Sequence, residues 1–349
     1  MRNIKVLILF LVASGYVQAQ QEVDPVRQKM MEAMKRKMID SIRSARIDEA
    51  ALIYPRIRQL TITHQSNGEG NIRSKLYGNA FFNGRMRVSR TTVNMNIPIL
   101  TQKKNTAVAS IGFVHQFFDL NQMTSQDPDY SVSEETRYVP MINLAASFNR
   151  RDTVFNIPVS LTASVGGLFN PDFASKQFRF LGILTVPIIR KENTNMTVGV
   201  VLNIDPSSLT PFIPLISYWH KFKAVDIDLL ADLPYRVALR RTIAKKNSVS
   251  IFSEMAGNNS FFGFDGPNPM LPHRMTFATT ELKTGLMFEH RLTRKAVLSF
   301  SGGLNSTLQS RIFRVGAKQN DYLIKNKTGA TPFVQVGFSL LPFWDPFKR

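Results

Sequence analysis

Histidine is the residue in this sequence most able to act as a general base, and it occurs five times. The positions are His64, His115, His220, His273 and His290. None stands in a spacing that implies a Ser-His or Asp-His site, and the H-E-x-x-H, G-x-S-x-G and phosphate-loop motifs do not occur. We therefore predict no catalytic residues. A lipid-modifying enzyme that uses His115 or His290 stays open, because adjacent strands can bring distant side chains together.

The composition narrows the classes of partner and cofactor. Cysteine does not occur among the 349 residues, which excludes disulfides, cysteine-ligated metals and a lipid-modified cysteine. There are 44 Lys+Arg against 25 Asp+Glu, and the formal net charge of +19 would suit nucleic acid or an anionic membrane. Because no nucleic-acid-binding motif is present and the chain begins with an export signal, we predict no nucleic-acid partner, no metal and no cofactor.

Residues 1–19 have the three parts of a secretory signal peptide. Met1 to Lys5 is basic, Val6 to Ala13 is apolar, and Val17-Gln18-Ala19 is a small-residue cleavage site. After this signal no apolar run of about 20 residues follows, so no helix is expected to cross a membrane. The exported chain is predicted to be either soluble or a membrane β-barrel.

A helix is predicted over residues 24–47, within a periplasmic segment at 20–55. Asp24-Pro25 supplies an N-cap and a first-turn proline, and Met30, Met34 and Met38 recur at four-residue spacing among basic residues. A basic amphipathic helix of this kind could contact an anionic surface or fill a pore. We favour the simpler interpretation, in which the methionine stripe packs against the rest of the protein.

From about residue 56 the apolar period changes from 3.6 to 2 and stays so to the C-terminus. One alternating apolar set is Val93, Met95, Ile97 and Ile99, and others begin near residues 142, 159 and 196. Several runs are longer than the roughly 5–6 residues of soluble strands and approach the roughly 9–11 of a tilted membrane-spanning strand. Alternation by itself fits both a soluble sandwich and a membrane barrel.

The connections favour the barrel, because short and long ones alternate along the chain. The predicted tight turns are 101–105, 150–154, 190–195, 221–223, 244–247 and 292–295, and the intervening loops are 119–135, 169–177, 205–211, 257–275 and 305–330, with 231–234 a short exception. Counting strands between them gives about fourteen, with residues 67–87 taken as a loop. Twelve is the alternative, because 224–231 and 235–243 are the weakest strands. An up-and-down transmembrane barrel has this arrangement of short periplasmic turns and long external loops.

Each tight turn carries two basic residues, so positive charge gathers at the end of the barrel that holds these turns. This predicted periplasmic-turn basic ring is Lys103, Lys104, Arg150, Arg151, Arg190, Lys191, Lys221, Lys223, Lys245, Lys246, Arg294 and Lys295. In one interpretation the ring meets anionic headgroups of the inner leaflet. In the other, Lys and Arg simply keep the turns soluble.

A second set of charges alternates with apolar residues in the later strands. These predicted lumen-facing residues are Asp226, Asp228, Arg236, Arg240, Glu254, Glu281, Lys283, Glu289 and Arg291. If Val237, Leu239, Leu282 and Leu286 face lipid, the charges face inward, where they must be paired or wet. They would form either a polar constriction that selects solutes or salt bridges that close the lumen.

The last strand completes a resemblance to the outer-membrane β-barrel proteins of Gram-negative bacteria, in particular those of unassigned function. Residues 331–340 alternate through Val334, Val336, Phe338 and Leu340, as in the aromatic-containing closing strands that the barrel-assembly machinery recognises. The chain departs from the pattern by continuing to Arg349. The resemblance implies location in the outer membrane, with membrane lipid and that machinery as partners, and it brings no functional residues.

The sequence thus predicts a signal peptide at 1–19, a basic helical segment at 20–55 and an all-β transmembrane barrel at 56–349. The favoured function is a pore or facilitated transporter for small solutes. The alternatives are a plugged structural or binding barrel that acts through its loops and, less favoured, a lipid-modifying membrane enzyme.

Overall fold

The computed structural model describes residues 25–102, 104–128, 133–208, 210–244, 246–263 and 271–343. The chain divides after Ile53 into a helical unit and a β-sheet unit, and each is described by itself. The predicted signal peptide lies outside the described residues and stays a prediction.

The helix α2 (Pro25–Ile53) begins at the predicted proline and ends later than predicted. Between Pro25 and Pro55 the sequence contains no glycine or proline. The residue before a proline disfavours helical backbone, and Tyr54 is accordingly extended, with φ −115° and ψ 93°. No helix in the described part of the chain is long and apolar enough to cross a membrane.

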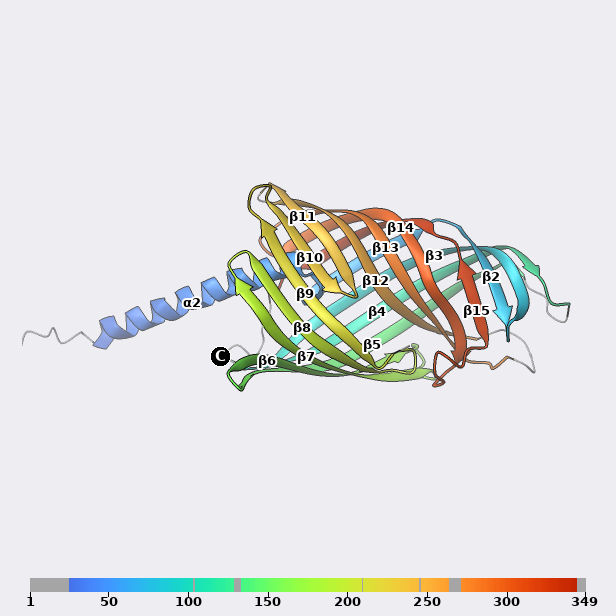
Figure 1. The fold of residues 1–349 in the computed structure, drawn as a ribbon, viewed down its shortest axis with the longest axis horizontal. Helices are drawn as coiled ribbons and strands as arrows, with labels where there is room; N and C mark the ends of the chain where they lie inside the picture. The colour runs from blue at the N-terminus through green and yellow to red at the C-terminus, as the bar shows by residue number, and fades with distance from the viewer. Residues whose placement is uncertain are drawn as a thin grey trace, which may run out of the picture. The chain divides into compact units, whose positions relative to one another are not determined.

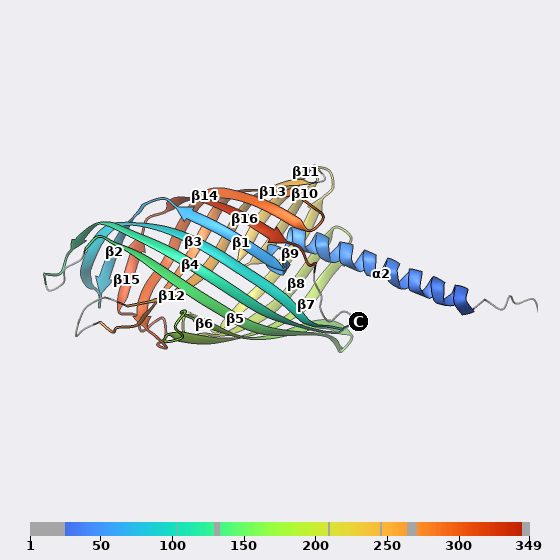
Figure 2. The same cartoon turned by 180° about the vertical axis from the view of Figure 1, so that it is seen from behind.

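After the short 3-10 helix η1 (Pro55–Ile57) the chain forms one antiparallel sheet, drawn in Figures 1 and 2. Its strands are β1 (Leu60–Asn67), β2 (Gly70–Leu76), β3 (Asn79–Thr101), β4 (Asn105–Ser125), β5 (Glu135–Val154), β6 (Ile157–Phe169), β7 (Lys176–Lys191), β8 (Thr194–Ile204), β9 (Phe212–Phe222), β10 (Ile227–Leu233), β11 (Arg236–Ala244), β12 (Asn247–Phe262), β13 (Met275–Arg291), β14 (Ala296–Arg314), β15 (Ile324–Thr328) and β16 (Thr331–Leu340). From β3 to β14 every strand pairs with its neighbour in the chain.

The first and last strands close the sheet into a barrel. β1 and β2 both run antiparallel to β3, and β15 and β16 both run antiparallel to β14, so each pair is one interrupted strand. These two composite strands pair in a single register, from Leu60↔Leu340 to Leu76↔Ile324. The result is a closed barrel of 14 strands, which confirms the predicted fold class and the higher strand count.

The predicted loop at 67–87 is wrong. It contains β2, a tight turn and the start of β3. Tyr77 and Gly78 have φ 48° and 93°, the left-handed pair that a two-residue hairpin turn requires. The predicted loops at 119–135 and 305–330 are also shorter than expected, because β4 continues to Ser125 and β14 to Arg314.

The six predicted tight turns lie at one end of the barrel, here called the turn end; the opposite end is the loop end. Two of these turns come later in the chain than predicted, one wholly and one in part. The β5–β6 turn is Phe155-Asn156, again with both φ angles positive, and the β9–β10 turn spans 223–226. The two strands predicted with least support are present as β10 and β11.

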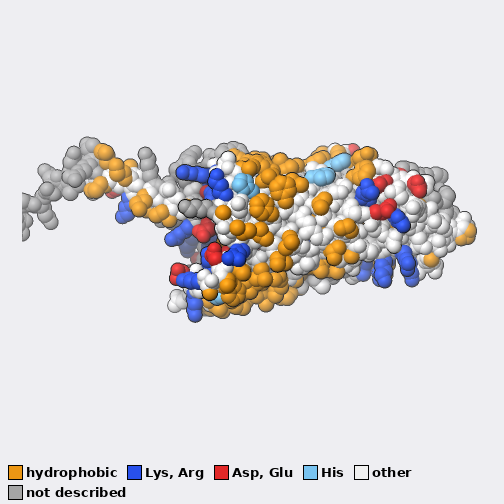
Figure 3. All heavy atoms as spheres, turned by 90° about the horizontal axis from the view of Figure 1, so that it is seen from above, with side chains coloured by type: hydrophobic (Ala, Val, Ile, Leu, Met, Phe, Trp, Pro, Cys, Tyr) orange, Lys and Arg blue, Asp and Glu red, His pale blue; other side chains and the backbone are white. Residues whose placement is uncertain are grey.

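Apolar side chains cover the outside of the wall toward the turn end. Leu161, Leu184, Leu239 and Leu286 are exposed, whereas the alternate residues face the interior. Figure 3 shows hydrophobic side chains gathered over the wall and basic side chains toward its ends. A transmembrane β-barrel has apolar side chains on its outer face and polar or charged ones inside. This arrangement excludes the soluble sandwich.

Aromatic residues mark two levels on this outer surface. Toward the turn end, His220 on β9 packs against Tyr218 and Phe222, with ring centroids 6.3 and 4.6 Å away. Toward the loop end, Tyr138 packs against Phe117, with ring centroids 5.1 Å apart. Such belts lie where a barrel wall passes from hydrocarbon to headgroups.

Above the second belt the polarity of the wall inverts. On β2, Ile72 and Leu76 are buried inside and Arg73 and Lys75 are exposed outside; β15 repeats this with buried Ile324 and exposed Lys325. The loop end of the lumen is therefore filled by an apolar cluster. Its buried members are Ile72, Leu76, Phe81, Phe82, Phe118, Val139, Met141, Phe261, Leu271, Met275, Phe277, Ile312, Leu323 and Ile324.

The outward direction of the apolar face can be tested on two neighbouring residues of β7. Leu184 faces outward near the middle of the strand, and Thr185 faces the lumen. Leu184→Arg should lower the free energy of unfolding by about 2–4 kcal/mol, because the guanidinium enters hydrocarbon. Thr185→Arg is the matched control and should change it little. Urea unfolding in lipid vesicles measures both, and equal effects would contradict the assigned faces.

Candidate functional site in the lumen

The chain enters the lumen at the turn end through Tyr54–Arg58, here called the lumen segment. Tyr54 lies near Ser217 on β9, and the Arg56 guanidinium lies 5.5 Å from the Tyr235 ring centroid. Arg58 Nη2 donates to Glu289 Oε1 on β13 at 2.6 Å, and both side chains are buried. Backbone bonds from Gln59 N to Leu340 O and from Asn96 N to Gln59 O then lead into β1. The segment is held mainly by polar contacts to the wall.

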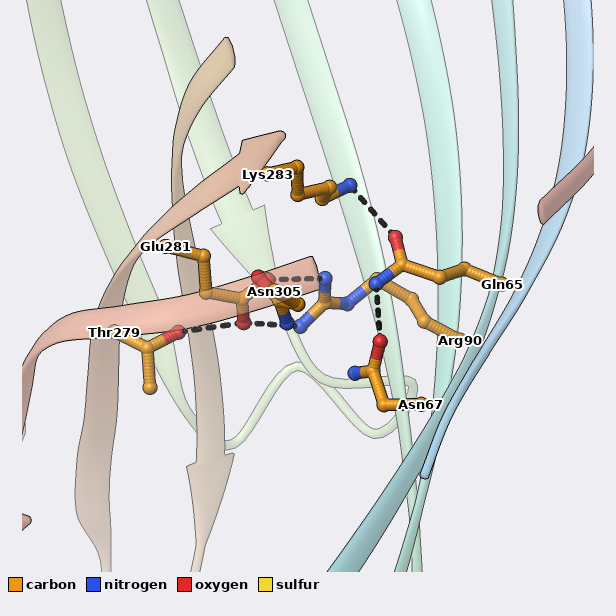
Figure 4. A network of polar contacts seen from close by, with 7 residues as sticks. All are labelled: Gln65, Asn67, Arg90, Thr279, Glu281, Lys283 and Asn305. Atoms are coloured by element: carbon orange, nitrogen blue, oxygen red, sulfur yellow. Dashed lines mark hydrogen bonds and ion pairs between the residues drawn. The ribbon is translucent and has the colours of Figure 1, made fainter. Parts of the chain in front are cut away.

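A second polar network crosses the lumen nearer its middle (Figure 4). Arg90 on β3 makes a bidentate pair with Glu281 on β13, through Nη2–Oε1 at 3.0 Å and Nη1–Oε2 at 3.3 Å. Along the wall these strands are separated by β1, β16 and β14. Thr279 Oγ1 and Asn305 Nδ2 also donate to Glu281, at 3.2 and 3.5 Å. The central carboxylate is therefore fully surrounded by donors.

Lys283 extends this network one step toward the turn end. Its Nζ donates to Gln65 Oε1 at 2.6 Å, and Gln65 Nε2 donates to Asn67 Oδ1 at 2.8 Å (Figure 4). Lys283 also stands opposite Glu254 in the β12–β13 register. Each buried charge of this level thus has an opposite charge or a hydrogen-bond acceptor, as a low-dielectric interior requires.

Two adjoining cavities lie between this network and the loop end. A cavity of about 100 Å³ is lined mostly by apolar residues, among them Phe82, Phe118 and Phe277. A smaller one of about 40 Å³ is lined by Arg90, Glu281, Asn305 and Thr328, and it also touches the strand interruptions at Gly68 and Gly329. The cavities share the lining residues Met86, Phe118 and Phe277.

Three atoms in the smaller cavity's lining residues lack a hydrogen-bond partner. Arg90 Nε, Asn305 Oδ1 and Thr328 Oγ1 are buried atoms with no partner among the described residues. Buried polar groups normally have one. These atoms offer one N–H donor, one carbonyl acceptor and one hydroxyl.

At the turn end the lumen widens on the side formed by β5–β8. A cavity of about 560 Å³, here called the vestibule, is lined by Lys104, Arg151 and Arg190 together with small residues such as Ser160 and Thr185. Neighbouring inward residues are also small and polar, and several bond to each other. For example, Asn149 Nδ2 donates to Ser160 Oγ at 2.8 Å and to Thr162 Oγ1 at 2.7 Å. Short side chains leave this half of the lumen unfilled.

The predicted lumen-facing charges occupy three kinds of place. Glu281, Lys283 and Glu254 belong to the central level, and Glu289 binds the lumen segment. Asp228 and Arg240 stand opposite each other in the β10–β11 register, as Arg236 and Glu254 do in the β11–β12 register. Trp219 Nε1 donates to Asp228 Oδ1 at 3.2 Å, so this carboxylate is held on the lumen side.

Two members of that set lie elsewhere than predicted. Asp226 is in the β9–β10 turn, where it is exposed and pairs with Lys221 at 2.9 Å. Its φ of +51° shows why the alternation fails there: the chain is turning rather than extended. Arg291 ends β13 and donates through Nε and Nη2 to Arg294 O, at 3.2 and 2.6 Å, so it braces a turn.

The members of the predicted basic ring that the structure describes lie at or near the turns of the turn end. Lys103 and Lys245 fall outside the described residues. Several members have acidic partners at the rim: Lys104 with Asp152 at 3.0 Å, Arg150 with Asp152 at 2.8 Å and Lys223 with Glu192 at 3.3 Å. The hydrogen bond from Arg150, the largest cause, and the one from Lys104 hold the pKa of Asp152 well below its usual range. This carboxylate therefore stays ionised and partly neutralises the ring.

The histidines are spread over the molecule rather than gathered at one site. His115 faces outward, stacked on Tyr138 with centroids 5.9 Å apart, and His64 Nδ1 lies 2.9 Å from Thr91 Oγ1 on the outer surface. His290 Nδ1 lies 2.6 Å from Asn247 Oδ1 at the turn end. In the described part of the chain, no group of three His, Asp or Glu residues could hold a metal ion.

Sequence reasoning missed Arg90, Gln65, Asn305 and the lumen segment. Arg90 had a usable signal, since it continues the even-numbered inward face of Asn94 and Asn96. The lumen segment had a weaker one, Pro55 followed by Arg56 and Arg58 ahead of the first strand.

Comparison with known proteins finds only remote similarity of fold. The translocator domain of autotransporter NalP from Neisseria meningitidis is 14% identical, with 89% of this chain and 98% of that chain covered and a TM-score of 0.31. An outer membrane channel from Pseudomonas putida F1 is 11% identical, covering 81% and 96%, with a TM-score of 0.34. The Pseudomonas putida toluene transporter TodX is 9% identical, covering 83% and 91%, with a TM-score of 0.32. No family model and no curated protein matches the chain.

The central ion pair allows a test of its energetic role. Arg90→Met leaves Glu281 buried without its charge partner and should lower the free energy of unfolding by about 3–5 kcal/mol. Arg85→Met, on the same strand, breaks an exposed pair with Glu69 and should cost below about 1 kcal/mol. Urea unfolding in vesicles compares the two, and adding Glu281→Leu to Arg90→Met should recover much of the loss. A small, equal cost for both single variants would show that the central pair is not desolvated.

Proposed function

We propose that the protein is an outer-membrane β-barrel that lets small solutes pass through its lumen by a facilitated route. The vestibule carries this proposal: its volume of about 560 Å³ and its lining of three basic residues, one acid (Asp152) and several hydroxyl side chains suit a hydrated path. The export signal and closing strand support an outer-membrane location in a Gram-negative bacterium, with the turn end toward the periplasm. On this proposal the basic ring meets lipid headgroups and the last strand meets the assembly machinery.

The route has two narrow points along its length. Between the loop-end cavities and the vestibule stand the Arg90–Glu281 and Lys283–Gln65 pairs, which a solute must pass or displace. At the turn end the lumen segment occupies the β9–β13 side. Ion pairs and hydrogen bonds can be exchanged for water at small net cost, whereas an apolar interlock cannot. The polar attachment of the lumen segment therefore suits a part that moves.

A plugged structural or binding barrel is the second candidate. It is favoured by the buried contacts of the lumen segment and by the central pairs, which link opposite parts of the wall through the lumen. A lipid-modifying enzyme receives less support. His115 and His290, its candidate catalytic residues, lie on different strands, His115 on β4 and His290 near the end of β13.

Ion selectivity tests whether the vestibule lies on the path. Replacing Arg151 and Arg190 together by Gln removes two positive charges from its lining, so the anion-to-cation permeability ratio should fall by a factor on the order of 3 to 10. The measurement is the zero-current potential of single barrels in a planar bilayer under a KCl gradient. Lys223→Gln at the exposed rim is the control and should leave the ratio unchanged. No conductance in any of the three proteins would favour the plugged barrel.

Channel gating tests the mobility of the lumen segment. Glu289→Gln leaves the buried Arg58 guanidinium without its carboxylate partner and near Arg240, which should disfavour the lodged position and raise the open probability at least about tenfold. Glu192→Gln removes the carboxylate of an exposed rim pair and should not change gating. The same open probability for wild type and both variants would mean that the segment is a fixed part of the wall.

A further inference from the structure

We infer that the two adjoining loop-end cavities form one binding site for a small phenol-class molecule, an uncharged aromatic ring with a hydroxyl group. This inference deepens the proposed function, on which its role in passage rests, by naming a class of solute. It begins from the division of the site into an apolar part of about 100 Å³ and a polar part of about 40 Å³.

The apolar part suits a single aromatic ring. A cavity of roughly 150 Å³ lined by Leu, Ile and Phe is known to admit benzene, and side chains such as Met86 can yield to enlarge this one. Phe277 is already in edge-to-face contact with Phe118 and Phe262, with ring centroids at 5.8 and 6.1 Å. A guest ring would extend the same geometry, which adds to the attraction beyond burial of area.

The polar groups around the apolar part already have partners and offer no binding group to a charged ligand. Arg137 pairs with Glu135 at 2.7 Å and donates to the Gly263 carbonyl. Asn326 accepts from Ser74 Oγ at 2.6 Å and donates to Ser310 Oγ at 3.2 Å. Because these groups already satisfy one another, entry of a neutral ring costs no broken hydrogen bond.

The polar part selects a hydroxyl group among possible substituents. Arg90 Nε–H is a donor without a partner and Asn305 Oδ1 an acceptor without one, and the two residues are 9% and 4% exposed. A hydroxyl accepts from the first and donates to the second at once. A bare hydrocarbon leaves both unpaired. A carboxylate has no hydrogen to donate and leaves Asn305 Oδ1 unpaired, and it adds a negative charge to a lining in which Glu281 already neutralises Arg90.

The test uses ligand-observed ¹⁹F NMR on the detergent-solubilised full chain, with 4-fluorophenol, fluorobenzene and 4-fluorobenzoate as probes. After subtraction of a detergent blank, 4-fluorophenol should bind saturably and about tenfold more tightly than fluorobenzene. 4-Fluorobenzoate should bind most weakly of the three. Asn305→Leu should abolish the preference for 4-fluorophenol over fluorobenzene while fluorobenzene still binds.

A matched pair of variants on β4 locates the site. Phe118→Trp fills the apolar cavity and should abolish binding of all probes, whereas Phe113→Trp makes the same change on the outward face and should not. Heat-modifiable gel migration confirms that each variant is folded. If Phe118→Trp fails to fold, Leu120→Phe, at the edge of the cavity, replaces it.

Two results would overturn the inference: binding that Phe118→Trp or its replacement leaves intact, or equal binding of 4-fluorophenol and fluorobenzene by the wild type. Neither touches the proposed passage function, which rests on the conductance of the vestibule variants. Conversely, saturable binding in a barrel that never conducts would keep the site and reject the passage.

Discussion

The structure depends on one constraint, which is that hydrocarbon offers no hydrogen bonds to a polypeptide backbone. Every peptide group in the wall must pair within the sheet, and an open edge would leave a row of them unpaired. The pairing of residues 60–76 with 324–340 in one register removes that edge. Closure by the first and last strands also places Leu60 and Leu340 side by side at the turn end. The chain just before β1 is thereby delivered to the mouth of the lumen, where Tyr54–Arg58 lies.

Closure also separates the lipid outside the barrel from the lumen inside it, and each strand must present a suitable face to both. Where lipid lies outside, period-2 alternation turns the polar face inward and puts charge in a confined space. A buried charge is costly unless it is paired. Some charges stand opposite a partner on the neighbouring strand, as Arg236 does with Glu254, and others meet across the lumen, as Arg90 and Glu281 do between strands that are not neighbours. One half of the lumen is consequently crossed by ion pairs and the other stays wide.

Alternation predicted which face of each strand is which, and this was enough to place Arg240, Glu281 and Glu289 inside. It could not predict which of them would meet, because Arg90 and Glu281 are 191 residues apart and nothing local couples them. Turn positions were predicted well where turn residues are concentrated, as at 292–295. They were shifted at Phe155-Asn156, because a phenylalanine in a left-handed turn is unusual and the preceding Arg-Arg-Asp looks more like a turn. The lumen segment could not be derived, because its contacts are spread over β9, β13 and β16.

The missed strand at 67–87 has a physical cause that also accounts for the proposed ligand site. A segment above the membrane has water outside, so its charged residues face outward and its apolar residues face inward, as in a soluble protein. Arg73, Lys75 and Arg85 are outside while Ile72 and Phe82 are inside, the reverse of Val93 and Asn94 lower on β3. A pattern fitted to greasy outward faces cannot recognise this part as wall. Yet because the inversion places phenylalanine and isoleucine inside the barrel directly above the Arg90–Glu281 level, an apolar cavity and unpartnered polar atoms come together at that boundary. On the proposed function, a solute that enters from the loop end would meet apolar side chains before it meets charged ones, an order that suits a molecule with a ring at one end and a hydroxyl at the other.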